Sequence, residues 1–261
     1  MRWKKPHMET PPALPAGVLA CLFDLDGVIT KTDIQHRRAW KRTFDPFLSG
    51  ADGQSRCPFT LSDYLRYVDG LPRREAVHRF LLSRRIRLPL GHADEPAGHC
   101  SEHQLANRKN DLLTEFLDTE EIEAYPGSLR FVRAVRRAGL RTAVVSASSH
   151  CARILDACGL TSLFDIRVDG ATVRERGLRG KPAPDPYLEA AAQLDIAPGR
   201  AAVFEDGPAG VEAAVAGAFG YVVAIDRCGL PDILEAQQPD ALVHDLAELL
   251  LPSPESGPAH A

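Results

Sequence analysis

The stretch CLFDLDGVITKT, residues 21–32, decides the fold, because an apolar run stops at two aspartates and a glycine. Together with the residues before it, VLACLF (18–23) predicts a buried strand. Asp24 and Asp26 follow with one residue between them, so alternation along an extended chain places both carboxylates on one side. Gly27 then lets the chain turn sharply. Two close carboxylates repel each other, and a divalent metal such as Mg²⁺ would relieve that repulsion; the plainer alternative is a polar turn after a strand.

The composition is that of an ordinary globular protein and argues against several classes of function. The 261 residues are 44% hydrophobic and 25% charged, enough for one large domain or a domain with an insertion. The net charge of −4 provides no electrostatic footprint for nucleic acid. No apolar stretch approaches the ~20 residues of a membrane span, and the proline-rich start lacks the apolar segment of a secretory signal. Six cysteines without a CxxC pair indicate reduced thiols, so we expect a cytoplasmic monomer that binds neither nucleic acid nor membranes.

From about residue 120 onward, β-like apolar runs alternate with helical patterns. This alternation predicts an α/β fold with a doubly wound parallel sheet, a Rossmann-like core whose ligands bind beyond the carboxyl ends of the strands. Gly139, Gly159 and Gly217 fall near the ends of helical stretches, where we expect left-handed caps. The predicted strands are RTAVVSAS (141–148), AAVFEDG (201–207), GYVVAID (220–226) and, more weakly marked, ALVHD (241–245).

The stretch 31–118 breaks the alternation and predicts an α-helical domain inserted after the first strand. Its loops are expected near 49–58 and 89–101, where polar residues or Gly and Pro gather. The segment GHADEPAGHCSEH (91–103) is rich in histidine, but its spacing matches no usual zinc site. We expect a core formed by 17–30 and 119–251, a helical cap formed by 31–118, and flexible tails at 1–16 and 252–261.

Further polar groups follow the predicted strands, at the edge where the two aspartates are expected. Glu205 and Asp206 form a second acidic pair at the end of one strand. Ser146 ends another strand with a hydroxyl donor, and Lys181 lies in GKPAPDP, where glycine and prolines would hold it in a fixed loop. Each has an ordinary alternative as a turn former, a helix cap or a solvated charge. Their common edge favours one functional site.

The segments DLDGV, VVSAS, KPAPD and FED resemble the four motifs of the haloacid dehalogenase superfamily, in that family's order. The resemblance spans about residues 18–250, and the helical insertion resembles a type C1 cap. It implies Mg²⁺-dependent phosphoryl transfer in which Asp24 attacks phosphorus and becomes an aspartyl phosphate. Asp26 would act as general acid and base, protonating the leaving oxygen and later deprotonating the acceptor.

The resemblance also assigns the remaining motif residues. Ser146 and Lys181 would complete the neutralisation of the phosphoryl oxygens, which is the dominant task in phosphoryl transfer. One Mg²⁺ is implied for each active site. Its implied ligands are Asp24, the backbone carbonyl of Asp26, Glu205 and Asp206.

Within the superfamily, the segments DLDGVITKTDIQHRRAW, YVDGLPRREAVHRFL, NRKND and GKPAPD resemble the β-phosphoglucomutase subfamily. Those enzymes interconvert β-D-glucose 1-phosphate and D-glucose 6-phosphate through β-glucose 1,6-bisphosphate, an intermediate that also activates them, so they need a second anion site. Arg73 matches the cap arginine that grips the distal phosphate, His36 a cap histidine linked to cap closure, and Lys109 a cap residue that reaches the sugar. The residues implied at the substrate are His36, Trp40, Gly70, Arg73, Lys109 and Ser148.

Departures from the subfamily pattern keep alternatives open. Lys31 stands where these enzymes commonly carry an acidic residue, and Ser149 and His150 stand where a Lys-Asn pair is familiar. A phosphatase of a sugar phosphate or similar small metabolite would share every core residue and differ only in the cap and its shielding from water. A hydrolytic dehalogenase is disfavoured, because that chemistry needs no Mg²⁺ and no second acid such as Asp26. A phosphate-sensing protein without activity would be expected to have lost Asp24, Asp26 or Lys181, and all three are present.

Overall fold

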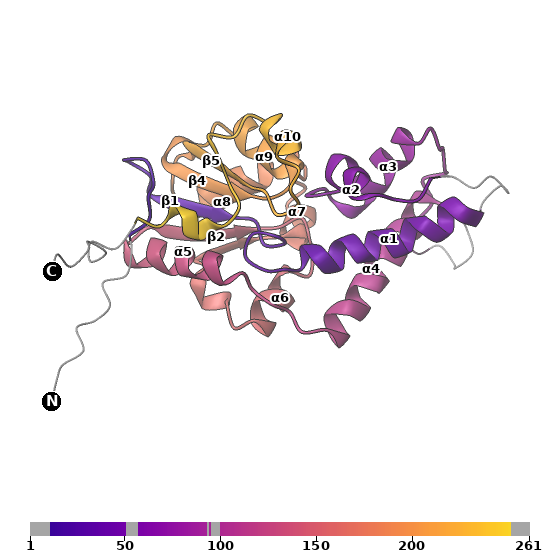
Figure 1. Ribbon diagram of the computed structural model, residues 1–261, viewed down its shortest axis with the longest axis horizontal. Helices are drawn as coiled ribbons and strands as arrows, with labels where there is room; N and C mark the ends of the chain where they lie inside the picture. Colours follow the sequence, from indigo (N-terminus) through magenta and orange to yellow (C-terminus); the bar gives the residue numbers. More distant parts are fainter. Residues whose placement is uncertain (1–10, 51–56, 93, 95–99, 252–261) are drawn as a thin grey trace, which may run out of the picture.

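A central parallel sheet organises the protein, which a computed structural model describes at residues 11–50, 57–92, 94 and 100–251. The sheet has six strands in the order β3-β2-β1-β4-β5-β6, and every neighbouring pair is parallel. Figure 1 shows the sheet and its helices at one side of the molecule and the cap helices at the other. The predicted doubly wound α/β fold with an inserted helical cap is therefore confirmed. The strands are β1 (Ala20–Phe23), β2 (Arg141–Val145), β3 (Ile166–Val168), β4 (Ala201–Glu205), β5 (Tyr221–Ile225) and β6 (Ala241–Val243).

The central strand β1 divides the core into two apolar layers. Phe23 faces the layer that includes residues of α5 and α6, whereas Leu22 faces the layer that includes residues of α8 and α9. Both side chains are fully buried. A parallel strand covered on both faces needs apolar residues at every position, which explains the unbroken run before Asp24. The helices of the core are α5 (Pro126–Arg137), α6 (Cys151–Ala157), α7 (Gly170–Glu175), α8 (Asp185–Gln193), α9 (Pro208–Ala216) and α10 (Pro231–Glu235), with short 3-10 turns η1 (Thr161–Leu163), η2 (Pro198–Arg200) and η3 (Leu246–Leu249).

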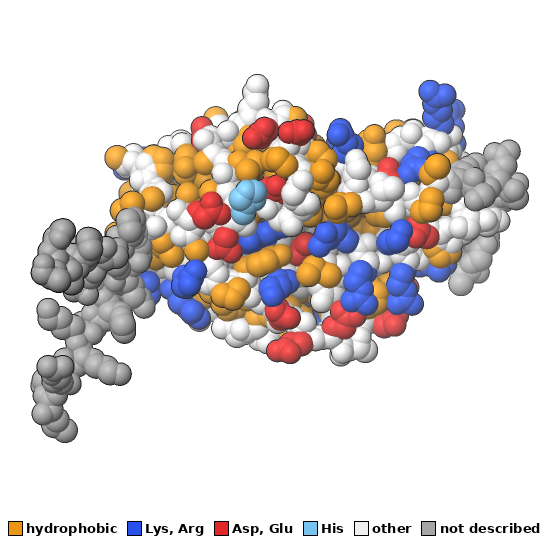
Figure 2. All heavy atoms as spheres, viewed as in Figure 1, with side chains coloured by type: hydrophobic (Ala, Val, Ile, Leu, Met, Phe, Trp, Pro, Cys, Tyr) orange, Lys and Arg blue, Asp and Glu red, His pale blue; other side chains and the backbone are white. Residues whose placement is uncertain are grey.

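The cap has an aromatic core of its own. Trp40 stacks on Phe44 with ring centroids 5.2 Å apart, and Phe44 packs against Phe80 at 4.2 Å. Figure 2 shows basic and acidic side chains interspersed over the visible face of the cap and the core. Among the described residues, none of the helices combines the length and the apolar character needed to cross a bilayer. The cap helices are α1 (Asp33–Gly50), α2 (Leu61–Tyr67), α3 (Arg73–Ser83) and α4 (Glu102–Thr119).

Two chain segments that run side by side join the cap to the core. Thr30 forms an antiparallel bridge with Ala124. The backbone nitrogen of Lys31 donates to the carbonyl of Glu123 at 2.8 Å, and the two side chains form an ion pair at 2.5 Å. Lys31, which departs from the subfamily pattern, thus has a partner of opposite charge at this junction.

Some local features differ from the sequence-based predictions. Strand β3 and helices α7 and α10 lie in stretches for which no element was predicted, and α1 continues through Gly50, into the loop expected near 49–58. Parts of the expected loops and tails, at 51–56, 93, 95–99, 1–10 and 252–261, lie outside the described residues.

One predicted helix cap is wrong. Gly139 and Gly159 have the expected positive φ values of 78° and 64°. Gly217 has φ −80°, and the left-handed residue is instead Ala218 at φ 52°. A Cβ at position 217 would lie 2.7 Å from the ring of Phe219, so the glycine serves close packing rather than a left-handed turn.

The substitution Phe23→Ala tests the packing of the central strand. Phe23 stacks on Phe204 at 4.8 Å and meets Phe131 edge-on at 6.2 Å, so its truncation leaves a large cavity. The free energy of unfolding should fall by ~3–5 kcal/mol, measured by urea denaturation followed by circular dichroism. Leu82→Ala, at a side chain that is 53% exposed, is the matched control and should change stability by less than ~0.5 kcal/mol. Similar losses in both variants would contradict this packing.

Candidate active site

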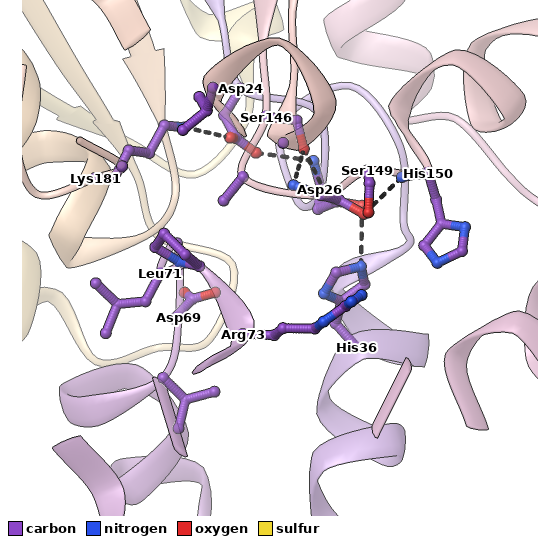
Figure 3. A pocket seen from close by; sticks show the side chains of 18 of the residues that line it. Asp24, Asp26, His36, Asp69, Leu71, Arg73, Ser146, Ser149, His150 and Lys181 are labelled. Carbon is purple, nitrogen blue, oxygen red and sulfur yellow. Dashed lines mark hydrogen bonds and ion pairs between the residues drawn. The ribbon is translucent and has the colours of Figure 1, made fainter. Parts of the chain in front are cut away.

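The cap and the carboxyl edge of the sheet enclose a pocket of about 410 Å³ (Figure 3). It lies beside the ends of β1 and β4, where the strand order reverses and where open α/β sheets bind their ligands. Its lining includes every site residue predicted from the sequence, which the structure thus brings together: Asp24, Asp26, His36, Trp40, Gly70, Arg73, Lys109, Ser146, Ser148, Lys181, Glu205 and Asp206.

A buried ammonium group links the motifs at the sheet edge. Nζ of Lys181 donates to Oδ1 of Asp24 at 2.6 Å, to Oε1 of Glu205 at 2.5 Å and to the carbonyl of Val145 at 3.0 Å. Burial opposes the charge of Lys181, but the two carboxylates outweigh it and raise the pKa of Lys181 above its usual value. The hydroxyl of Tyr187 donates to the same Glu205 oxygen at 2.6 Å. These contacts hold the side chains of Asp24, Lys181, Tyr187 and Glu205 in fixed positions relative to one another.

Three carboxylates next to this ammonium form a group suited to a metal ion. Asp24, Glu205 and Asp206 each offer an oxygen, and these oxygens lie within 4.8 Å of one another. Burial, and after it the negative charges of Asp69, Asp24 and Glu205, raise the pKa of Asp206 well above its usual range. A Cβ at Gly27 would lie 1.7 Å from Oδ2 of Asp206, so only glycine leaves room for this carboxylate. Oxygen donors with excess negative charge fit Mg²⁺.

The carboxylate of Asp26 is held by hydroxyl groups rather than by Lys181. Its Oδ1 accepts a hydrogen bond from the Thr32 hydroxyl at 2.5 Å, and its Oδ2 accepts one from the Ser146 hydroxyl at 3.1 Å. Nε2 of His36 lies 3.6 Å from Oδ1 of Asp26 and has no hydrogen-bond partner. The cap side chain His36 thus reaches the carboxylate that was expected to handle protons (Figure 3).

Lys109 and His36 form a polar pair inside the cap. Nζ of Lys109 lies 3.2 Å from Nδ1 of His36 and 5.2 Å from the centre of the Trp40 ring. Burial, together with the charge of Lys109, lowers the pKa of His36 to about 3, so this imidazole is neutral. Burial also lowers the pKa of Lys109 to about 7. When protonated, Lys109 donates to Nδ1, which directs the remaining ring proton of His36 toward Asp26.

Cap and core also meet at Asn110. Its Oδ1 accepts a hydrogen bond from Nη1 of Arg73 at 2.5 Å and lies 3.2 Å from Nε2 of His150. The hydroxyl of Ser148 accepts from the backbone nitrogen of His150 at 3.2 Å. Arg73 is therefore held by a neutral amide, and Gly70, with φ 71°, turns the chain three residues before it.

Several pocket residues were missed in the sequence. Asp69, Asn110 and Arg174 line the pocket, and Tyr187 binds a site carboxylate from inside α8. For two of them a weak signal existed, since Asp69 precedes Gly70 and Asn110 lies in NRKND. Tyr187 follows the spacing of an ordinary buried helix residue, and Arg174 lies in a stretch without a predicted element.

The substitution Lys109→Met tests the burial of this amine. Between pH 7 and about 10 the unfolded chain keeps a proton that folded Lys109 has lost, so this group makes stability rise with pH over that window. Below pH 7 the folded protein must bury the ammonium, and methionine removes that cost. The melting temperature should therefore rise by ~2–6 °C at pH 6 and by less at pH 9.5, measured by calorimetry without substrate. Lys41→Met, at an exposed lysine, is the control; an equal gain at both pH values would contradict the assignment.

The comparisons with known proteins agree with the motifs. The model of the haloacid dehalogenase-like hydrolase family matches residues 18–217. A protein of Mycobacterium bovis named β-phosphoglucomutase is 45% identical over 91% of this chain and 93% of its own length. A phosphorylated carbohydrates phosphatase of Thermotoga maritima is 28% identical over 75% of this chain and 79% of its own length.

The same fold occurs in a solved structure. The crystal structure of β-phosphoglucomutase from Clostridium difficile matches with a TM-score of 0.70, at 20% identity, over 89% of this chain and 93% of that one. This likeness shows that the two proteins share a fold. The family match and the 45% identical relative go further: the chain belongs to the haloacid dehalogenase-like hydrolase family.

Proposed function

We propose that this protein is a β-phosphoglucomutase, which interconverts β-D-glucose 1-phosphate and D-glucose 6-phosphate. The observation that carries the proposal is one pocket that has the carboxylates at the ends of β1 and β4 on one side and Arg73 in its cap wall. The carboxylates suit phosphoryl transfer through an aspartate, and the arginine suits a phosphate that does not react. The 45% identity to the M. bovis β-phosphoglucomutase supports the same reaction.

In the first half of the proposed reaction, Asp24 carries the phosphoryl group. The C6 hydroxyl oxygen of β-glucose 1-phosphate attacks phosphorus, the bond from phosphorus to Asp24 breaks, and Asp26 takes the hydroxyl proton. The product is β-glucose 1,6-bisphosphate. The Thr32 and Ser146 hydroxyls, which bind the two oxygens of Asp26, hold that carboxylate in position for the proton.

In the second half, the bisphosphate has turned round in the pocket. A carboxylate oxygen of Asp24 attacks the phosphorus at C1, and the bond from phosphorus to the sugar oxygen breaks. Asp26 returns its proton to that oxygen, so that glucose 6-phosphate leaves and Asp24 is phosphorylated again. Lys181, 2.6 Å from Oδ1 of Asp24, reduces the repulsion between this carboxylate and the approaching phosphate.

The acidic group at the sheet edge fits Mg²⁺ as cofactor. Asp24, Glu205, Asp206 and the carbonyl of Asp26 would hold the ion, which supplies neutralisation of the phosphoryl charge when bound. We further propose that residues 17–30 and 119–251 form the catalytic core and 31–118 the cap, and that the protein acts on small phosphorylated sugars as a cytoplasmic monomer.

A phosphatase of a sugar phosphate is the second candidate. Ser149 and His150 replace a Lys-Asn pair of the β-phosphoglucomutase pattern, and the T. maritima relative is named a phosphorylated carbohydrates phosphatase. Such an enzyme would pass the phosphoryl group of Asp24 to water instead of to a sugar hydroxyl.

Product analysis by ³¹P NMR separates the two candidates. The purified protein is given Mg²⁺, β-glucose 1-phosphate and a trace of glucose 1,6-bisphosphate. Conversion to glucose 6-phosphate without free phosphate is the expected result. Release of inorganic phosphate alone would overturn the mutase and establish the phosphatase.

The substitution Asp24→Asn tests the nucleophile. A neutral amide cannot form the phosphoenzyme, so the mutase rate should fall by at least ~1,000-fold while circular dichroism shows an unchanged fold. Retention of a tenth or more of the rate would remove Asp24 from this position in the mechanism.

The substitution Arg73→Ala tests the anion site in the cap. Loss of a charge-assisted contact should reduce kcat/KM of the mutase ~10–100-fold, but hydrolysis of p-nitrophenyl phosphate, which has no second phosphate, by less than ~3-fold. Arg79→Ala, on the same helix and paired with Glu75, is the matched control and should leave both activities unchanged. Equal losses on the two substrates would argue against Arg73 as a phosphate ligand.

A further inference from the structure

Arg73 and Arg74 of the cap line the pocket, and Arg174 brings a further guanidinium to it from the core. It lies in the last turn of α7 and lines the same pocket as Arg73. The helix is fixed at its start, because Asp169 caps it by accepting two backbone hydrogen bonds. A Cβ at Gly170 would lie 2.7 Å from the carbonyl oxygen of Ala147, so α7 packs closely on the loop after β2. Arg174 thus lies on a helix whose position is fixed by these contacts.

The side chains around Arg174 and Arg73 are rich in positive charge. The pKa of Arg73 is lowered by burial and then by the charge of Arg174. Burial lowers the pKa of His150 too, with Lys109 and Arg73 adding to the effect. This part of the pocket therefore lies near the guanidinium groups of Arg73 and Arg174 and the amine of Lys109, whereas the sheet edge carries the carboxylates.

The two arginines are not neutralised by protein carboxylates. Arg73 donates to the neutral amide of Asn110, and Asp111, whose charge acts on Arg73, forms no ion pair with it. No ion pair joins Arg73 or Arg174 to any of the described carboxylates. Other arginines around α7 differ, since Arg176 pairs with Glu189, Arg167 with Asp169 and Arg179 with Asp185.

We infer that Arg174 binds, together with Arg73, the phosphate of the bisphosphorylated sugar that does not react. This inference rests on the proposed mutase and adds a specificity residue to it. Guanidinium groups bind phosphate oxygens strongly, and two of them match the charge of a phosphate dianion. One arginine comes from the cap and the other from the core, so a ligand with a remote phosphate joins the two parts. A ligand without a remote phosphate has no group for these two arginines to bind.

The experiment compares binding of a bisphosphate with a reaction that needs only the sheet edge. Glucose 1,6-bisphosphate and glucose 6-phosphate are titrated by calorimetry, with Mg²⁺, into Asp24→Asn protein that carries Arg174→Ala, Arg174→Lys or Arg176→Ala. Hydrolysis of p-nitrophenyl phosphate is measured for the same three substitutions with Asp24 intact. Arg176→Ala is the matched control, because it removes a charge beside α7 that is already paired.

We expect the loss of binding affinity to be selective for the bisphosphate. Arg174→Ala should weaken its binding about tenfold, Arg174→Lys should recover part of the loss, and hydrolysis of the aryl phosphate should change less than ~2-fold. Unchanged binding of the bisphosphate in Arg174→Ala would overturn the assignment of Arg174, and the mutase stands as long as Asp24→Asn protein binds the bisphosphate more tightly than glucose 6-phosphate. Equal losses in binding and hydrolysis would also overturn it, since they indicate a structural effect. If Asp24→Asn protein binds the bisphosphate no more tightly than glucose 6-phosphate, the proposed mutase fails together with this inference.

Discussion

The contact of Lys181 with Asp24 and Glu205 is the interaction on which the active site depends. An ammonium group that is 2% exposed is stable only when carboxylates surround it, and removal of one partner of such a buried pair costs ~3–5 kcal/mol. Asp24 follows β1, Glu205 ends β4 and Lys181 lies in the loop before α8, so one contact joins segments that are more than 150 residues apart in the chain. Two carboxylates per ammonium leave negative charge, which is why this edge of the sheet suits a cation and a phosphoryl group together.

Much of the fold could be predicted because the central strands are buried on both faces. Continuous apolar runs ending in polar residues mark β1, β2, β4 and β5, and each of these strands begins within two residues of its predicted run. Strand β3 was missed since its three residues, IRV, include an exposed arginine and lie at the edge of the sheet. Gly217 shows a different limit: sequence spacing reveals a glycine near a helix end, but not whether a turn or a neighbouring ring requires it.

The site could be predicted to the extent that its residues follow strands or match motifs. The ends of parallel strands meet at one edge, so Asp24, Ser146 and Glu205 were expected to converge, and they line one pocket. Asp69 and Arg174 depend instead on how the cap and a six-residue helix are placed against that edge. No periodicity in the sequence encodes such a placement, which is set by packing between segments far apart in the chain.

The paired segments at the base of the cap have a mechanical consequence. Thr30 bridges Ala124 in the returning segment, and its hydroxyl lies 2.7 Å from that of Thr32, whose own hydroxyl binds Asp26. The carboxylate of Asp26 is therefore tied, through two threonine hydroxyls, to a segment that joins the cap to the core. Any displacement of this segment relative to the core would be transmitted to the position of that carboxylate.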